Sequence, residues 1–164
     1  MNCSNCGAPL DVAGPGSYLY CRYCSSLFFP TASQDKVDVI GIESQLHCPV
    51  CRDTLVAATV ADIPAQYCRR CHGVLINQGM FALVVKYLRA HDRAPNAPLR
   101  PLNRDDLQRV LHCPGCNQLL ETHPYYGPGN IVIDVCMRCR LVWLDGGELR
   151  AISNAASWVH DIDE

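Results

Sequence analysis

The 164-residue chain lacks several features that would place it in a large class of proteins at once. No run of about 18 apolar residues occurs, so we expect no transmembrane helix and no membrane partner. No basic stretch with an apolar core follows Met1-Asn2-Cys3, so we expect no signal peptide. Basic residues are not in excess either: the net charge is −2, whereas phosphate contacts need Lys and Arg gathered on one face.

No cysteine is left over when the cysteines are paired by spacing. The 12 cysteines form six Cys-x-x-Cys pairs that enclose, two pairs at a time, loops of 14, 16 and 19 residues: Cys3/Cys6, Cys21/Cys24, Cys48/Cys51, Cys68/Cys71, Cys113/Cys116 and Cys136/Cys139. A two-residue gap lets a tight turn present both sulfurs to one ion, and a β-hairpin between two such turns closes them around it. Four thiolates make a tetrahedral structural zinc site with no open position for water or substrate. We therefore expect three zinc ribbons with three Zn²⁺ ions and no chemistry at the metal.

Other uses of paired cysteines compete with zinc. Disulfide scaffolds belong to secreted chains, and no export signal is visible. Rubredoxin-like iron or an iron–sulfur cluster would use the same thiolates, so ligand type alone does not separate zinc from iron. The clustered cysteine spacing of bacterial ferredoxins is absent, which favours zinc. Reduced thiolates also lead us to expect a cytoplasmic location.

The cysteine spacing predicts the fold class and the organisation of the chain. Modules below about 40 residues usually need a metal, disulfides or a partner to fold. We expect a small metal-stabilised α+β protein of three tandem four-cysteine ribbons built on β-hairpins, the second and third each followed by a helix. The expected parts are ribbon 1 at 1–30, a linker at 31–45, ribbon 2 with its helix at 46–91, a proline-rich linker at 92–110 and ribbon 3 with its helix at 111–160.

Ribbons 2 and 3 are internal repeats. Aligned on their cysteines, Leu75 matches Trp143 and Asn77 matches Asp145. Asp145 lies three residues before Glu148, which is the spacing of a capping box, and Asn77 is placed to cap the earlier helix. Apolar residues at helical spacing follow in both repeats: Phe81, Val84, Val85 and Leu88 in one, and Leu149, Ile152 and Ala156 in the other.

The segments between the cysteine pairs and between the ribbons predict turns, a short strand and a basic stretch. Turn residues at 14–17 and 125–130 predict the hairpin turns of ribbons 1 and 3. The alternation in Val37–Ile40 could add an edge strand within the first linker. Six basic residues lie between Lys86 and Arg109, either as a solvated helix face with a linker or as a nucleic-acid contact.

A family resemblance is carried by ribbon 3. Its Cys-Pro-x-Cys, hairpin, Asp-x-Cys-x-x-Cys pattern, followed by residues 142–149, resembles the small zinc-finger family named after the zinc ribbon of transcription factor IIB. Ribbon 2 resembles this family with Met80 in place of Glu148 and Leu75 in place of Trp143, and ribbon 1 resembles only a generic zinc ribbon. The resemblance covers about 46–88 and 111–158. It implies a zinc-binding protein, and because fold does not imply function it implies no particular activity.

Some side chains near the metal sites have two interpretations. Trp143 either packs over the third site or stacks on a nucleobase. Four arginines either compensate the charge of the zinc–thiolate centres or contact a partner or phosphate: Arg69, Arg70, Arg138 and Arg140.

For the carboxylates and histidines near the ribbons, a structural role explains the sequence better than a catalytic or metal-binding role. Asp145 and Glu148 could form an acid–base pair, although helix capping explains both. His47 and His112 each precede a cysteine pair and could replace a ligand, although four sulfurs already fill each site. We therefore expect no catalytic residue, no small-molecule substrate and no enzyme activity.

The functional hypothesis is a non-enzymatic zinc-ribbon adapter for protein–protein interaction, in a transcription-related assembly. An alternative is a nucleic-acid-binding transcription regulator that uses the arginines above. A third hypothesis is a thiol redox switch, because Cys-x-x-Cys thiolates become reactive once the metal leaves.

Overall fold

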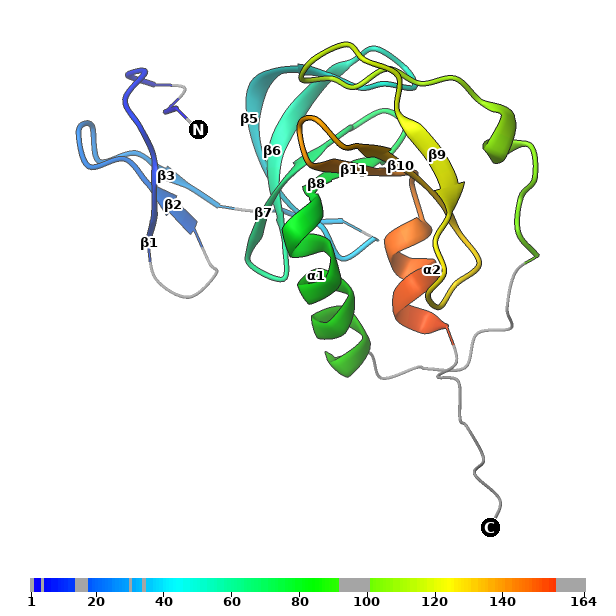
Figure 1. Cartoon of the computed structure of the whole chain (residues 1–164). Coiled ribbons are helices and arrows are strands. Elements are labelled where there is room, and N and C mark those ends of the chain that lie inside the picture. Colours follow the sequence, from blue (N-terminus) through cyan, green and yellow to red (C-terminus); the bar gives the residue numbers. More distant parts are fainter. Residues whose placement is uncertain are drawn as a thin grey trace.

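The strands form two sheets of unequal size, and two helices lie side by side against the larger one (Figure 1). The structure, a computed structural model, describes residues 2–3, 5–13, 18–29, 31–33, 35–91 and 101–155. The small sheet, ribbon 1, has the order β1 (Asp11–Ala13), β2 (Tyr18–Tyr20), β3 (Leu27–Phe28). The large sheet has the order β4 (Thr31–Ala32), β5 (Asp38–His47), β6 (Thr54–Val60), β7 (Ile63–Tyr67), β8 (Val74–Asn77), β11 (Leu141–Leu144), β10 (Val132–Cys136), β9 (Glu121–Pro124).

Helices follow ribbons 2 and 3, as the sequence predicts. They are α1 (Gln78–His91) and α2 (Glu148–Asn154), and a short 3-10 helix, η1 (Asp106–Gln108), precedes ribbon 3. The expected α+β fold of metal-stabilised ribbons is confirmed. None of the helices in the described ranges has the length and apolar character needed to cross a bilayer. The predicted turn at 14–17, residues 92–100 of the proline-rich linker and Ala156 lie outside the described residues.

Ribbons 2 and 3 share one sheet through equivalent strands. β6-β7-β8 form ribbon 2 and β9-β10-β11 form ribbon 3, all antiparallel. β8 pairs antiparallel with β11, with Leu75 opposite Trp143 and Ile76 opposite Val142. Because Leu75 and Trp143 are aligned residues of the two repeats, an approximate twofold axis passes through this pair. The duplicated unit thus packs against its own copy as the subunits of a symmetric dimer do.

A long internal strand begins in the first predicted linker and ends in ribbon 2. β5 has ten residues and pairs with β6 on one side and β4 on the other, so it is not the brief edge strand expected at Val37–Ile40. Register shifts along β5 mark bulges, which bend a strand. The local sequence alternates only briefly, and β6 supplies the pairing partner that extends the strand. The division of the chain into domains stays a prediction.

Ribbon 1 is attached to the large sheet by a small apolar cluster. Leu19 of β2 packs with Ile40 and Ile42 of β5 and Ala57 of β6, and Phe28 of β3 joins them. This contact places one face of the small sheet against β5 and leaves the opposite face outward.

The two faces of the large sheet bury different kinds of core. Alternate residues of a strand point to opposite faces, and accordingly Leu75 and Trp143 belong to one cluster and their neighbours Val74 and Val142 to another. The first cluster contains the cysteines of ribbons 2 and 3. The second lies under the helices and includes their predicted apolar residues: Phe81, Val84, Val85, Leu88, Leu149 and Ile152.

The two helix starts differ from one another. Asn77 caps α1 as predicted, since its Oδ1 accepts a hydrogen bond from the Gly79 N–H at 2.9 Å. At α2 only half of the predicted capping box forms: Glu148 Oε2 accepts from the Asp145 N–H at 2.6 Å, while Gly147 stands at the cap with no side-chain hydrogen bond. The Asp145 carboxylate does not cap the helix, because Arg109 and Trp143 bind it instead.

Candidate metal centres

Each cysteine pair sits in a turn with the same backbone pattern. In ribbon 2 the Cys48 N–H donates to the Asp53 carbonyl and the Arg52 N–H to the Cys48 carbonyl. The N–H groups of Val50 and Cys51 point at the Cys48 Sγ, both at 3.4 Å. Such N–H groups stabilise a thiolate, so the turn prepares a sulfur for a metal ion.

A left-handed residue follows every pair, and the sequence analysis missed it. The residue after the second cysteine has a positive φ between 54° and 75° in all six turns: Gly7, Ser25, Arg52, His72, Asn117 and Arg140. Left-handed backbone costs a non-glycine residue roughly 1–2 kcal/mol, and five of these six are not glycine. The only sequence signal for these positions is their place directly after each pair.

The sulfurs of each predicted set of four come together. Within each set, the four Sγ atoms all lie within 4.8 Å of one another. Contacts that cross from one pair to the other are close, at 3.6 Å for Cys3–Cys24, 3.4 Å for Cys48–Cys71 and 3.7 Å for Cys116–Cys136. A tetrahedral zinc ion with Zn–S distances of about 2.3 Å separates its sulfurs by about 3.8 Å. The three sets therefore fit three zinc ions.

The neighbouring thiols shift each other's pKa, because two adjacent thiolates repel, and a bound dication offsets this repulsion. The contact with Cys71 lowers the pKa of Cys48 to about 5, and the same contact raises the pKa of Cys71 above its usual range. One sulfur of the pair ionises at the expense of the other, because neighbouring thiolates repel. Bound Zn²⁺ holds all four as thiolates and leaves a centre with a net charge of −2. The ion would supply structural cross-linking, and the saturated donor set leaves it no free position.

The second and third metal centres share one apolar cluster with Trp143 at its middle. Trp143 is fully buried there, together with Leu75, Leu120 and cysteines of both sites. This corrects the prediction that Trp143 could stack on a nucleobase, because its ring has no exposed surface. A Cβ at Gly73 would lie 2.1 Å from the Trp143 ring, so the indole rests directly on the backbone of ribbon 2.

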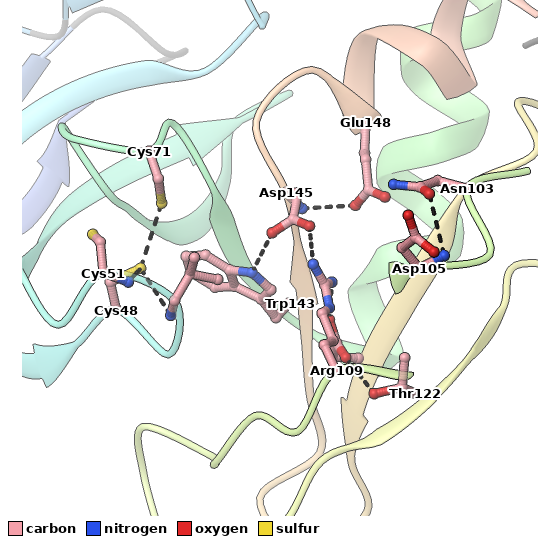
Figure 2. Close-up of polar contacts among 12 residues, drawn as sticks. Cys48, Cys51, Cys71, Asn103, Asp105, Arg109, Thr122, Trp143, Asp145 and Glu148 are labelled. Carbon is pink, nitrogen blue, oxygen red and sulfur yellow. Dashed lines mark hydrogen bonds and ion pairs between the residues drawn. The ribbon is translucent and has the colours of Figure 1, made fainter. Parts of the chain in front are cut away.

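A buried polar network lies beside Trp143 (Figure 2). The Arg109 guanidinium binds both Asp134 and Asp145. Asp134 is fully buried and also accepts from the Thr122 hydroxyl at 2.6 Å, while Asp145 accepts from the indole N–H of Trp143 at 3.0 Å. Arg109 therefore joins the segment before ribbon 3 to its hairpin and to the start of α2. It is not available for phosphate, as the nucleic-acid hypothesis for this stretch required.

Burial is the main cause of the raised pKa values of two carboxyl groups in this region, Asp134 and Glu148. Burial raises the pKa of Asp134, although Thr122 and Arg109 oppose the shift. Burial also raises the pKa of Glu148 to about 8, opposed by the hydrogen bond from the Asp145 N–H. Asp134, on the sheet, is held in an ion pair with Arg109, and Glu148, on α2, accepts the Asp145 N–H at the start of the helix. Trp143 packs beside them.

The four candidate arginines differ in what they contact. Arg69 donates to the Gly41 carbonyl at 3.3 Å, and Arg70 pairs with Asp53 at 3.3 Å on the surface. Arg138 and Arg140 are exposed, and no side-chain partner is recorded for either among the described residues. All four remain candidate contacts. His47 and His112 lie outside the three sulfur clusters of the described residues.

Comparison with known families matches two segments of the chain. Residues 47–82 and 112–155 fit the family described as transcription factor zinc-finger, of the transcription factor IIB ribbon type. No match was found among curated proteins or solved structures. The predicted resemblance of ribbons 2 and 3 is confirmed, and the cluster at 3–24 supports a generic ribbon before them. The segments 47–82 and 112–155 of this chain are thus similar to the transcription factor zinc-finger family.

Proposed function

We propose that this zinc-ribbon protein is a non-enzymatic adapter that binds another protein, in an assembly related to transcription. The outward face of ribbon 1 carries the proposal. Leu19 and Phe28 are register partners that pack inward, so Tyr20 and Leu27, the next pair along, point outward. Tyr18 stands on this face with its ring centroid 5.9 Å from that of Phe29.

The exposure and charge of this outward face favour a protein partner. Leu27 is 50% exposed and Phe29 66% exposed, with Tyr23 on the neighbouring turn 78% exposed. Ribbon 1 contains a single basic residue, Arg22. Single-stranded nucleic acids need both stacking aromatics and a positively charged groove, and only the aromatics are present here. Exposed apolar patches of this kind are typical of protein interaction sites.

The chemistry of the chain supports a binding role in a reducing compartment. The three metal centres have four sulfur donors each and no open position, so the proposal assigns them to folding. Thiolates that bind zinc must stay reduced, which is the reason to propose a cytoplasmic location.

The test compares partner capture by the zinc-loaded chain and a surface variant. We expect Leu27→Ser with Phe29→Ser to lose protein partners that the tagged wild type retains from native lysate after nuclease treatment. Leu119→Ser is the matched control, because Leu119 is also exposed, at 62%, but lies on ribbon 3. Equal capture by all three proteins would contradict the proposal.

Nucleic-acid binding is the second candidate, favoured by the exposed Arg138 and Arg140 on the last cysteine turn. Phosphate contacts release counterions, so affinity for DNA or RNA would fall steeply with salt. Replacing both arginines with glutamine would then reduce that salt dependence. Affinity that is independent of salt would remove this candidate.

A further inference from the structure

A polar pocket of about 530 Å³ lies where three distant parts of the chain meet. The segment before β5, the second cysteine turn of ribbon 2 and the start of α2 form its walls. Its polar side chains are Ser33, Asp35, Tyr67, His72 and Arg150, and Cys71 of the second metal centre also lines it. None of these side chains except that of Cys71 is a ligand in the metal centres or part of the outward face of ribbon 1.

Asp35 is the one acidic residue that lines this pocket. The residue is only 8% exposed. Its backbone N–H donates to the Ser33 hydroxyl at 3.2 Å, but its carboxylate accepts no hydrogen bond from the part of the chain that is described. The nearest cation is the Arg150 guanidinium, whose Nε lies 3.9 Å away, beyond hydrogen-bond distance. The carboxylate lines an open pocket and is reached by no closer donor among the described residues, so the site has capacity for an external donor.

The charges around the pocket favour a cation as that donor. Asp35 contributes −1, and the zinc–thiolate centre that includes Cys71 contributes −2 when the metal is bound. Arg150 contributes +1 and is half exposed, with 46% of its side chain accessible. Tyr67 is neutral, and its hydroxyl is 2.6 Å from the His72 Nδ1, which orients both side chains at the wall. The pocket is therefore negative at its base.

The size and donor set of the pocket exclude a bare divalent ion as its natural occupant. Calcium takes six to eight oxygen ligands, and magnesium needs close octahedral geometry. Here one carboxylate and two hydroxyls lie in a volume far larger than the roughly 30 Å³ of one water. An organic cation on a flexible chain fits both the charge and the space. A guanidinium group can bind a carboxylate through two parallel hydrogen bonds, and an ammonium group supplies three donors.

We propose that this pocket binds the cationic side chain of a Lys or Arg residue of a partner protein, with Asp35 as the counter-ion. The proposal rests on the adapter function and adds the chemistry of the partner. Ribbon 1 offers an apolar face and the pocket a charged anchor, so a partner segment would combine exposed apolar side chains with a basic residue.

The test is a titration of the full, zinc-loaded chain followed by ¹H–¹⁵N NMR. The basic probes are Nα-acetyl-arginine amide and Nα-acetyl-lysine amide, with Nα-acetyl-norleucine amide and Nα-acetyl-glutamate amide as neutral and acidic controls. We expect saturable shifts of the Asp35, Tyr67 and His72 amides with the basic probes alone. Asp35→Asn should weaken this binding at least tenfold, whereas Glu43→Gln, an exposed acid on β5, should leave it unchanged.

A second variant tests the charge argument in the opposite direction. Arg150→Met removes the cation that competes for Asp35, so it should tighten binding of the basic probes. Equal binding of the acidic probe, or unchanged binding in both Asp35→Asn and Arg150→Met, would overturn the proposal. Spermidine carries the same ammonium groups, and a hundredfold preference for it over the lysine probe would overturn the assignment to a partner side chain.

The outcome is separable from that of the adapter test. The probes are small and do not touch the outward face of ribbon 1, so Leu27→Ser with Phe29→Ser should bind them as the wild type does. If partner capture proves independent of ribbon 1 while the probes still need Asp35, the adapter proposal fails and the pocket stands as a cation site. If the probes do not bind while capture depends on ribbon 1, only the pocket proposal fails.

Discussion

Arg109 is the residue on which the polar interior of ribbon 3 depends. Its guanidinium forms ion pairs with both Asp134 and Asp145, and Asp134 is fully buried. Removing one partner of a buried ion pair leaves an uncompensated charge, which typically costs about 3–5 kcal/mol. We therefore expect Arg109→Met to lower the free energy of unfolding by about 3 kcal/mol, measured by urea denaturation with zinc present.

Two further variants make this prediction specific. Arg104→Met changes the same type of residue at an exposed position nearby, and should stay within about 0.5 kcal/mol of the wild type. Asp134→Asn added to Arg109→Met removes the buried charge, so it should restore part of the lost stability. An Arg109→Met variant as stable as Arg104→Met would show that the network contributes nothing.

Glu148 gives the stability of the chain a dependence on pH. Burial raises its pKa from an ordinary 4.5 to about 8 in the folded protein. Between these values the folded state holds a proton that the unfolded state has released, so stability falls as pH rises through this window, by at most about 1.4 kcal/mol per pH unit. Glu148→Gln keeps an oxygen for the Asp145 N–H and does not titrate. Its stability relative to the wild type should therefore increase from pH 6.5 to pH 8.5 in parallel denaturation curves, and a constant difference would contradict the assigned pKa.

At the scale of elements, the contact between β8 and β11 depends on a pairing of large and small residues. Trp143 stands where ribbon 2 has Leu75, and Gly73 provides the space for its ring. A Cβ at Gly73 would overlap the indole, and overpacking in a core costs roughly 1–3 kcal/mol. We expect Gly73→Ala to destabilise the protein by at least this amount. Gly79→Ala, in α1, is the control, because its Cβ would meet only the side-chain oxygen of Asn77, at 3.2 Å.

A double-variant cycle identifies the Trp143 ring as the cause. Trp143→Leu leaves a cavity and should itself destabilise the chain. If the clash with the ring is the reason for the effect of Gly73→Ala, that substitution should cost much less in the Trp143→Leu background. Additive effects of the two substitutions would place the cause elsewhere.

The sequence predicted the elements better than their assembly. The metal sets, the ribbon hairpins and both helices follow from cysteine spacing and local periodicity, which act over a few residues. The pairing of β8 with β11 joins residues almost 70 positions apart, and nothing local distinguishes an exposed strand edge from one that meets its repeat. The Asp145 spacing suggested a cap, but Arg109, which comes from a segment expected to be a linker, competes for the carboxylate. Trp143 had two interpretations because its burial depends on both ribbons.

At the scale of the whole molecule, the three metal centres are not equivalent. Among the described residues, ribbon 1 packs on the large sheet through a small cluster around Leu19, and no cysteine of its metal centre belongs to that cluster. The centres of ribbons 2 and 3 belong to a single apolar cluster around Trp143 and to one sheet. Zinc binding and folding are coupled in such modules. Loss of the ion of ribbon 2 or of ribbon 3 should therefore weaken zinc binding at the other of these two centres. Loss of the ion of ribbon 1 should leave both of them bound.

This difference predicts opposite outcomes for two matched cysteine variants. Cys21→Ser, in ribbon 1, should leave two zinc ions per chain and a melting temperature of the large sheet within a few degrees of the wild type. Cys136→Ser, at a similarly buried position in ribbon 3, should also weaken zinc binding at ribbon 2 and expose Trp143, because both centres pack on that ring. The measurements are zinc content by mass spectrometry after stepwise chelation and the fluorescence of Trp143, with Trp158→Phe in the background. If each variant loses one zinc and the fluorescence of both stays that of a buried indole, the two central sites are independent and the shared cluster does not couple them.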